Sequence, residues 1–93
     1  MEKHEESFRP LWALRPGEEA VIAAVIDGGG PESPFGRLAQ LGYFPGERVK
    51  KVLESPLGDP SAYLVRGTVT AIRRQDARFV IVGPFDPETE AGL

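Results

Sequence analysis

Two tight turns constrain the fold of this chain more than any other feature. The first lies in the stretch 37–46, RLAQLGYFPG, in which a short apolar helix is stopped by a glycine. The second is the stretch 56–60, PLGDP, which separates two further apolar runs. Glycine accepts the left-handed backbone that other residues avoid, and proline fixes φ near about −65°. We therefore interpret six residues as determinants of turn geometry: Gly42, Pro45, Gly46, Gly58, Asp59 and Pro60.

Short β-branched runs between turns predict a mainly β fold. We expect strands over five segments: 19–26, 48–53, 62–66, 68–72 and 78–82. One short helix is expected between the first and second strands, with Ser33 as its N-cap and Gly42 as its left-handed end. The stretch 73–77 is predicted to form a 3₁₀ turn. Five strands and one helix in so few residues indicate a small, strongly bent barrel.

Composition limits the class of protein. A chain of 93 residues is long enough for one small domain, and its charged fraction of 27% is ordinary for a globular protein. The absence of cysteine excludes disulfides and cysteine-based metal sites. The acidic start lacks the apolar segment of a secretory signal. The longest apolar run, 20–26, has seven residues, whereas a membrane span needs about 20.

Charge is distributed unevenly along the chain. Between Ser7 and Phe85, ten basic residues stand against eight acidic ones, a net charge of +2. The remaining six acidic residues lie near the ends: Glu2, Glu5, Glu6, Asp86, Glu88 and Glu90. Because the basic excess is small, we expect no nucleic-acid partner. We divide the chain into a flexible leader over 1–8, a domain over 9–83 and an acidic tail over 84–93.

Strand alternation separates core from surface residues. Tyr63 and Val65 are expected to face inward, which leaves Leu64 facing outward. In the first turn, Tyr43 is expected to close the core and Phe44 to stay near the surface. Three apolar residues are then candidates for a partner-contact patch, which often marks an interface: Phe44, Leu57 and Leu64. The alternative is that the helix, the leader or the tail covers them.

On the helix, Phe35, Leu38 and Leu41 are predicted to share the buried face. Phe8, Leu11, Trp12 and Leu14 are expected to close one end of the core.

The charged residues suggest no reaction centre. Asp59 is expected to cap its own turn, and Arg73-Arg74 to form a local ion pair with Asp76. Three cations, Arg48, Lys50 and Lys51, are interpreted as a solvated face, the alternative being contact with an acidic partner or anionic headgroups.

Metal binding and catalysis are both poorly supported by the residue types. His4 is the single histidine, and together with Glu2, Glu5 and Glu6 it offers at most a weak site for a divalent ion. No Ser–His pair or paired carboxylates lie on a predicted rigid element. We therefore expect neither a metal site nor a cofactor nor an enzyme.

The order of the turns and strands resembles a known family. The matching positions run from Gly17-Glu18 through Gly28-Gly29, Arg37-Leu38, Leu41-Gly42, Pro45-Gly46, Val49, residues 56–60, Gly67 and 71–74 to Ala77, Val80 and Val82. This pattern closely resembles the FeoA family, small cytosolic proteins of bacterial ferrous iron transport, over residues 11–82. Ser61 and Thr70 depart from it, because the family usually has aliphatic residues there.

The resemblance implies an SH3-like β-barrel that is not an enzyme. Members are thought to act with FeoB, a membrane iron transporter that carries a cytoplasmic GTP-binding domain. It therefore implies a cytoplasmic accessory protein that contacts this domain and reaches the membrane only through the transporter, with homo-oligomers left open. The same domain type also occurs in metal-dependent repressors. An SH3-like partner module of a metal-responsive repressor is therefore the alternative function.

Overall fold

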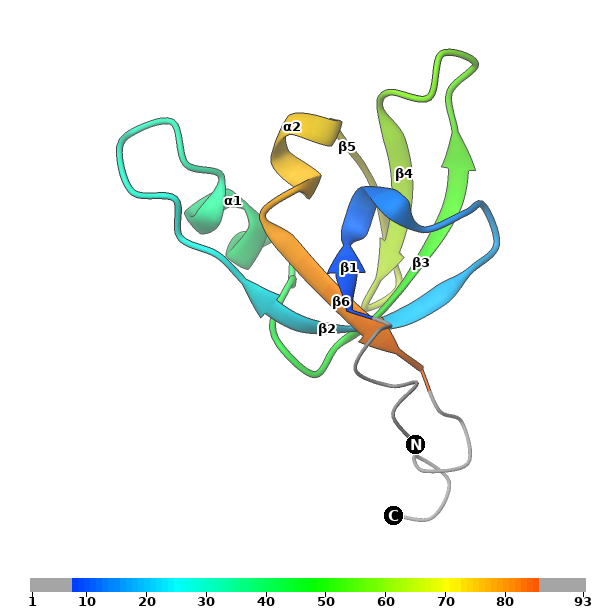
Figure 1. Ribbon diagram of the computed structural model, residues 1–93, viewed down its shortest axis with the longest axis horizontal. Helices are drawn as coiled ribbons and strands as arrows, with labels where there is room; N and C mark the ends of the chain where they lie inside the picture. The colour runs from blue at the N-terminus through cyan, green and yellow to red at the C-terminus, as the bar shows by residue number, and fades with distance from the viewer. Residues whose placement is uncertain (1–7, 86–93) are drawn as a thin grey trace.

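The computed structural model describes residues 8–85 as six antiparallel strands with three short helices (Figure 1). The strands lie in one sheet in the order β1-β6-β2-β3-β4-β5. In chain order the elements are β1 (Arg9–Pro10), the 3₁₀ helix η2 (Leu11–Ala13), β2 (Glu19–Val25), α1 (Phe35–Gln40), β3 (Arg48–Glu54), β4 (Ser61–Val65), β5 (Thr68–Ile72), α2 (Arg74–Ala77) and β6 (Val80–Pro84). Within this part of the chain, no helix has the length and hydropathy needed to cross a bilayer.

The mainly β, SH3-like fold predicted from the sequence is confirmed, with three differences in detail. The sheet has six strands rather than five, because the two-residue strand β1 pairs with β6. Its proline is tolerated because β1 lies at the edge of the sheet. The segment predicted as a 3₁₀ turn forms the short helix α2. At the other end, β6 extends to Pro84, where the acidic tail was expected to begin.

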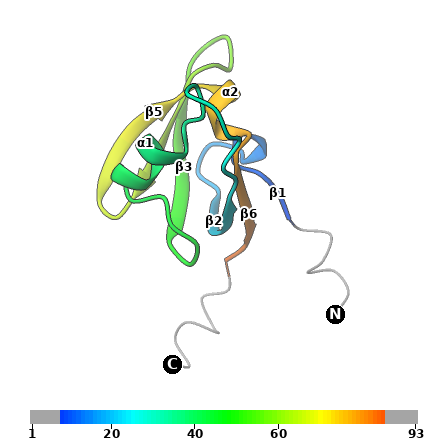
Figure 2. The same cartoon turned by 90° about the vertical axis from the view of Figure 1, so that its left-hand side faces the viewer.

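Two bulges bend the sheet into a barrel-like shape (Figure 2). One interrupts the β2–β6 pairing between Ile22 and Ala24, and the other interrupts β3–β4 between Lys51 and Leu53. An extra residue in one strand increases the local twist and bends that strand. The sheet order nevertheless leaves β1 and β5 as edges, so the sheet is not closed by hydrogen bonds.

The core lies inside this bent sheet. Its buried apolar residues come from η2, α1, α2 and every strand except β1, together with Leu14 and Tyr43 from the connections. Tyr43, Tyr63 and Val65 are buried as expected, whereas Phe8 and Trp12 are 54% and 37% exposed and lie outside the core, so their predicted place is wrong. Leu11 and Leu14 do close the end of the core, because they lie three residues apart on the side of η2 that faces inward.

Helix α1 is anchored at both ends. Ser33 Oγ accepts a hydrogen bond from the Phe35 amide at 3.2 Å, and Gly42 has a φ of +95°. Leu38 is fully buried, but Phe35 is 39% exposed, so its predicted place on the buried face is wrong. A six-residue helix places one or two side chains on the core, and Phe35 lies in its first turn.

Lys51 was expected on a solvated face and is instead buried, with 3% of its surface exposed. Its Nζ donates to the Trp12 carbonyl at 3.1 Å and to Glu54 Oε1 at 3.1 Å. Strand alternation explains the difference, because Lys51 follows Val49 on the inward face of β3. The buried ammonium group links η2 to β3.

Candidate interaction surface

The outward face of strands β4 and β5 is apolar, and β3 adds one apolar residue to it beyond its charged start. Leu64 is paired with Val69 across β4 and β5, and Ala62 is paired with Ala71 in the next outward row. The bulge in β3 turns Leu53 to the same face, opposite Ala62. We call these five residues the outer sheet surface: Leu53, Ala62, Leu64, Val69 and Ala71.

This apolar character is unusual for the solvent side of an antiparallel sheet. Such sheets commonly place polar residues on the face opposite the core. Here Leu53 is 64% exposed and Val69 is 57% exposed. Exposed apolar patches of this kind mark interaction sites. The outer sheet surface is therefore the best candidate for contact with another macromolecule.

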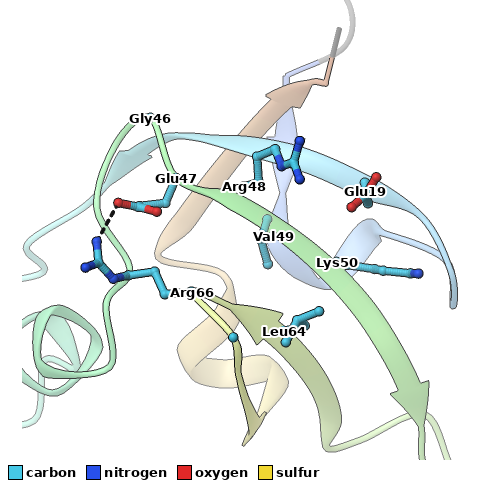
Figure 3. Close-up of a pocket in the computed structure, with 9 residues that line it drawn as sticks. Glu19, Gly46, Glu47, Arg48, Val49, Lys50, Leu64 and Arg66 are labelled. Atoms are coloured by element: carbon cyan, nitrogen blue, oxygen red, sulfur yellow. Dashed lines mark hydrogen bonds and ion pairs between the residues drawn. The ribbon is translucent and has the colours of Figure 1, made fainter. Parts of the chain in front are cut away.

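A hollow of about 380 Å³ borders the outer sheet surface at the start of β3 (Figure 3). Leu64 lines it, and charged side chains surround it. Arg66 donates to Glu47 at 2.8 Å on one side, and Lys50 lies on the other. Arg48 also lines the hollow and has its guanidinium 4.6 Å from the centre of the Phe85 ring. Glu19 is the second acid of the lining, so its three cations exceed its two acids.

Arg66 has a backbone conformation that arginine rarely adopts. Its φ of +54° and the φ of +82° at Gly67 fit a two-residue type I′ turn between β4 and β5. Asparagine and glycine are the usual residues there, because a Cβ in the left-handed conformation lies too close to the following carbonyl oxygen, glycine has no Cβ, and the short polar side chain of asparagine can hydrogen-bond locally. Local strain tends to persist where a side chain is needed for another purpose. Arg66 therefore points to a role at the rim of the hollow.

The structure brings two of the three predicted contact residues to the same end of the barrel. Leu64 lines the hollow, and Phe44, 46% exposed, belongs to the turn that supplies Gly46 and Glu47 to its wall. Leu57 belongs to the turn that follows the other end of β3, and Figure 1 shows this turn. The seven residues of β3 separate the two turns by about 20 Å. The prediction of one patch containing all three residues is therefore wrong.

The predicted turn glycines have the expected geometry. Gly42, Gly46 and Gly58 all have positive φ, between +85° and +96°. The Asp59–Pro60 peptide bond is cis. Asp59 does not bond within its own turn as expected, because its Oδ1 accepts the Arg74 amide at 2.9 Å.

The predicted local ion pair of Arg73-Arg74 with Asp76 is also wrong. The carboxylate of Asp76 pairs with Arg37 of α1 at 2.5 Å.

Sequence reasoning missed a second group of surface residues, around Trp12 and α2. The Arg74 guanidinium lies 4.6 Å from the centre of the Trp12 ring, above a shallow hollow of about 460 Å³. The signal was present in the sequence, because Leu11 and Leu14 occupy the inward positions of their turn and leave Trp12 outside. The guanidinium stacking joins residues far apart in sequence and has no local signature.

Within residues 8–85, no three His, Asp or Glu side chains are close enough together to hold a metal ion. The weak divalent site predicted around His4, with Glu2, Glu5 and Glu6, lies outside the described residues. Burial tends to raise the pKa of Glu18, but hydrogen bonds from Arg9 and from the Arg15 amide outweigh it and lower that pKa.

Comparison with solved structures identifies the fold's relatives. FeoA from Stenotrophomonas maltophilia, solved in complex with zinc, is 32% identical over 78% of this chain and 87% of its own, with a TM-score of 0.70. FeoA from Chlorobium tepidum is 28% identical over 83% of this chain and 70% of its own, also with a TM-score of 0.70. A manganese-dependent transcriptional repressor has a TM-score of 0.73 over 84% of this chain and 42% of its own. At 18% identity the repressor shows a shared fold only.

Sequence comparison gives a more specific result. Among curated proteins, no sequence match is found. The FeoA domain family model matches residues 9–84, which is most of the chain. The chain therefore belongs to the FeoA domain family, whose members are implicated in ferrous iron transport.

Proposed function

We propose that this protein is a non-enzymatic, cytoplasmic accessory factor of bacterial ferrous iron uptake that binds the GTP-binding region of a FeoB-type transporter. Membership of the FeoA domain family supports the role in iron transport. The related protein from Stenotrophomonas maltophilia has been put forward as a bacterial ferrous iron transport activating factor. Such a role requires contact with a partner rather than a reaction centre.

The observation that carries the proposal is the outer sheet surface. Its apolar residues come from three adjacent strands, with Lys50 of β3 directly opposite Leu64 at its border. The hollow with Arg48, Lys50 and Arg66 adjoins this face. A partner that covers both would bury Leu64 and Val69 and place acidic groups opposite the basic rim. Apolar burial would give affinity, and the rim would set orientation and association rate.

The test is a titration of the full chain into the isolated GTP-binding domain of the transporter, without nucleotide, with GDP and with a non-hydrolysable GTP analogue. Binding in at least one state is expected, and it should weaken as salt screens the basic rim. Absence of binding in all three states would overturn the proposal.

The role as a partner module of a metal-responsive repressor stays a prediction. The gene's neighbour would distinguish the two, since a transporter gene favours the first role and a regulator gene favours the second.

A further inference from the structure

Three segments meet at the end of the molecule opposite the hollow of Figure 3. The hydrogen bond from the Arg74 amide to Asp59 ties the 55–60 turn to α2. The stacking of Arg74 on Trp12 ties α2 to η2. Figures 1 and 2 both show the 55–60 turn and α2 at the same end, with the start of β1 and the end of β6 at the other.

The most exposed large apolar side chain among the described residues projects from this end. Leu57 is 94% exposed at the tip of its turn, and Trp12 is 37% exposed beside α2. Both lie outside the core, so neither is needed to fill it. We call the group of Trp12, Leu57, Arg73, Arg74 and Arg78 the tip surface.

The tip surface carries three exposed arginines. Asp59 lines the same hollow as Arg74 and Arg78 and keeps its charge, because it accepts only the Arg74 backbone amide, whereas Asp76 is paired with Arg37; the three arginines therefore outnumber the one acid that is not in an ion pair. Arg78 lies 4.9 Å from the centre of the Phe79 ring and donates from Nε to the Gln75 carbonyl at 3.0 Å. Stacking on a ring holds a guanidinium plane in place and leaves its N–H groups available to oxyanions.

We propose that the tip surface docks onto an anionic phospholipid bilayer, with Leu57 entering the interfacial region and the arginines contacting headgroup phosphates. Protruding aliphatic and Trp side chains next to arginines are typical of proteins that lie on membrane surfaces. An acidic peptide is a poorer match, because it would be held in the shallow hollow that Trp12 and Arg74 line, and Leu57 is not part of that hollow. Leu57 instead stands on a convex turn.

This inference goes beyond the proposed function, because it gives the protein a membrane contact of its own. The resemblance to the FeoA family implied that the membrane is reached only through the transporter. Residues of the tip surface are separate from those of the outer sheet surface, so both contacts can form at once.

The docking is expected to be weak and reversible. Each arginine near an anionic leaflet contributes about five-fold to the partition constant, and the leucine side chain about ten-fold. Such a contact would raise the local concentration of the protein near a membrane-bound partner without anchoring it permanently.

The test is flotation of the full chain with vesicles of phosphatidylcholine alone or of phosphatidylcholine mixed with phosphatidylglycerol. Binding is expected for the mixed vesicles only. It should fall when ionic strength rises from about 0.1 M to about 1 M, because the Debye length shortens from about 10 Å to about 3 Å. Equal binding to both kinds of vesicle, or to neither, would overturn the proposal.

Two variants locate the contact. Leu57→Asp is expected to lower the partition constant at least ten-fold, and Arg78→Gln about five-fold. Both positions are exposed, so thermal melting should show that the variants stay folded. If soluble polyglutamate binds and these variants weaken that binding while no protein floats, the surface recognises an acidic protein instead and the proposal is wrong.

A matched control separates this inference from the proposed function. Val69→Asp places the same charge on the outer sheet surface and should leave flotation unchanged. If Leu57→Asp floats like the unaltered chain, the membrane proposal fails whatever the transporter titration shows. If flotation behaves as expected but the transporter domain does not bind, the proposed function alone fails.

Discussion

At the scale of single residues, two buried tyrosines show how the core treats polar groups. Burial raises the pKa of Tyr43 well above its usual range, and the neighbouring Tyr63 adds to this effect. Burial is also the main cause that raises the pKa of Tyr63 to about 12, although a hydrogen bond with Ser61 opposes it. The hydroxyl of Tyr43 is buried without a hydrogen-bond partner. Both side chains therefore stay protonated in the folded protein at neutral pH.

This predicts a loss of stability at high pH. In the unfolded chain the two tyrosines ionise near their ordinary pKa of 10, while in the folded chain they remain protonated. Above pH 10 the folded state therefore binds more protons than the unfolded state, and its stability falls as pH rises. The two tyrosines should leave the melting temperature independent of pH below pH 10 and should make it fall above pH 10. Tyrosinate absorbance that appears before unfolding would contradict this account.

Replacement of Tyr43 by phenylalanine should not destabilise the protein at pH 7. The lost hydroxyl makes no hydrogen bond in the structure, so its removal relieves a desolvation cost of about 1–3 kcal/mol or leaves stability unchanged. The free energy of unfolding in urea is the measurement, with Tyr63→Phe as the matched control. The Tyr63 hydroxyl is not a buried group without a partner, so that control should gain no stability. If Tyr43→Phe lowers the free energy of unfolding by more than about 1 kcal/mol, the Tyr43 hydroxyl has a hydrogen-bond partner and this account is wrong.

Arg66 is expected to contribute to binding at the expense of the stability of its turn. Asparagine fits the left-handed first position of a type I′ turn better than arginine does. The ion pair lost with Glu47 is largely exposed and contributes about 0–1 kcal/mol. Arg66→Asn is therefore expected to keep or slightly raise the melting temperature while it weakens binding to the transporter domain. Glu47→Gln, which keeps the arginine, should not weaken binding. Equal binding by Arg66→Asn and the unaltered chain would show that Arg66 is not part of the contact with the transporter domain.

At the scale of elements, helix α1 depends on the residue that ends it. Gly42 has a φ of +95°, and a Cβ placed there would lie 2.8 Å from Cδ of Arg66. The Arg66 side chain can move, so the backbone conformation is the larger cost. Gly42→Ala should reduce the free energy of unfolding by about 1–2 kcal/mol.

The control is Gly36→Ala within α1, where no atom lies within 4 Å of the added Cβ and φ is ordinary. That control should be neutral or stabilising by up to about 1 kcal/mol. Equal stability of the two variants in urea unfolding would contradict this explanation.

The elements also show how far sequence alone could lead. Glycines and prolines predicted the turns, because the backbone conformations at these positions admit few other residues. Strand alternation correctly placed Tyr63, Val65 and Leu64. It could not place Leu53, because counting from Val49 in steps of two predicts an inward side chain. The bulge after Lys51 reverses this assignment, and nothing in the local sequence marks it.

Contacts between distant elements were the other part that sequence could not provide. Asp59 bonds to α2 rather than within its turn, and Asp76 bonds to α1 rather than to its neighbouring arginines. Both partners are far away in sequence, so no spacing rule identifies them. The prediction of a single contact patch failed for the same reason, because Phe44 and Leu57 are both apolar but lie at opposite ends of β3.

At the scale of the whole molecule, the barrel carries two separate surfaces. One lies on the outward face of the sheet, and the other lies at the end formed by the 55–60 turn and α2. The outer sheet surface and its basic hollow suit a folded protein partner, whereas the tip surface suits an anionic bilayer. The described domain is small, with a radius of gyration of 13.0 Å. One molecule of this size could touch a membrane and a membrane-bound partner at once.

The central claim is that the outer sheet surface binds the cytoplasmic GTP-binding region of a FeoB-type transporter. The most direct measurement compares the dissociation constants of the unaltered chain, Val69→Asp and Leu57→Asp for that domain in each nucleotide state. Val69→Asp should weaken binding at least ten-fold, because it puts a charge in an apolar contact. Leu57→Asp should bind like the unaltered chain. Unchanged binding by Val69→Asp, with both variants folded, would contradict the claim.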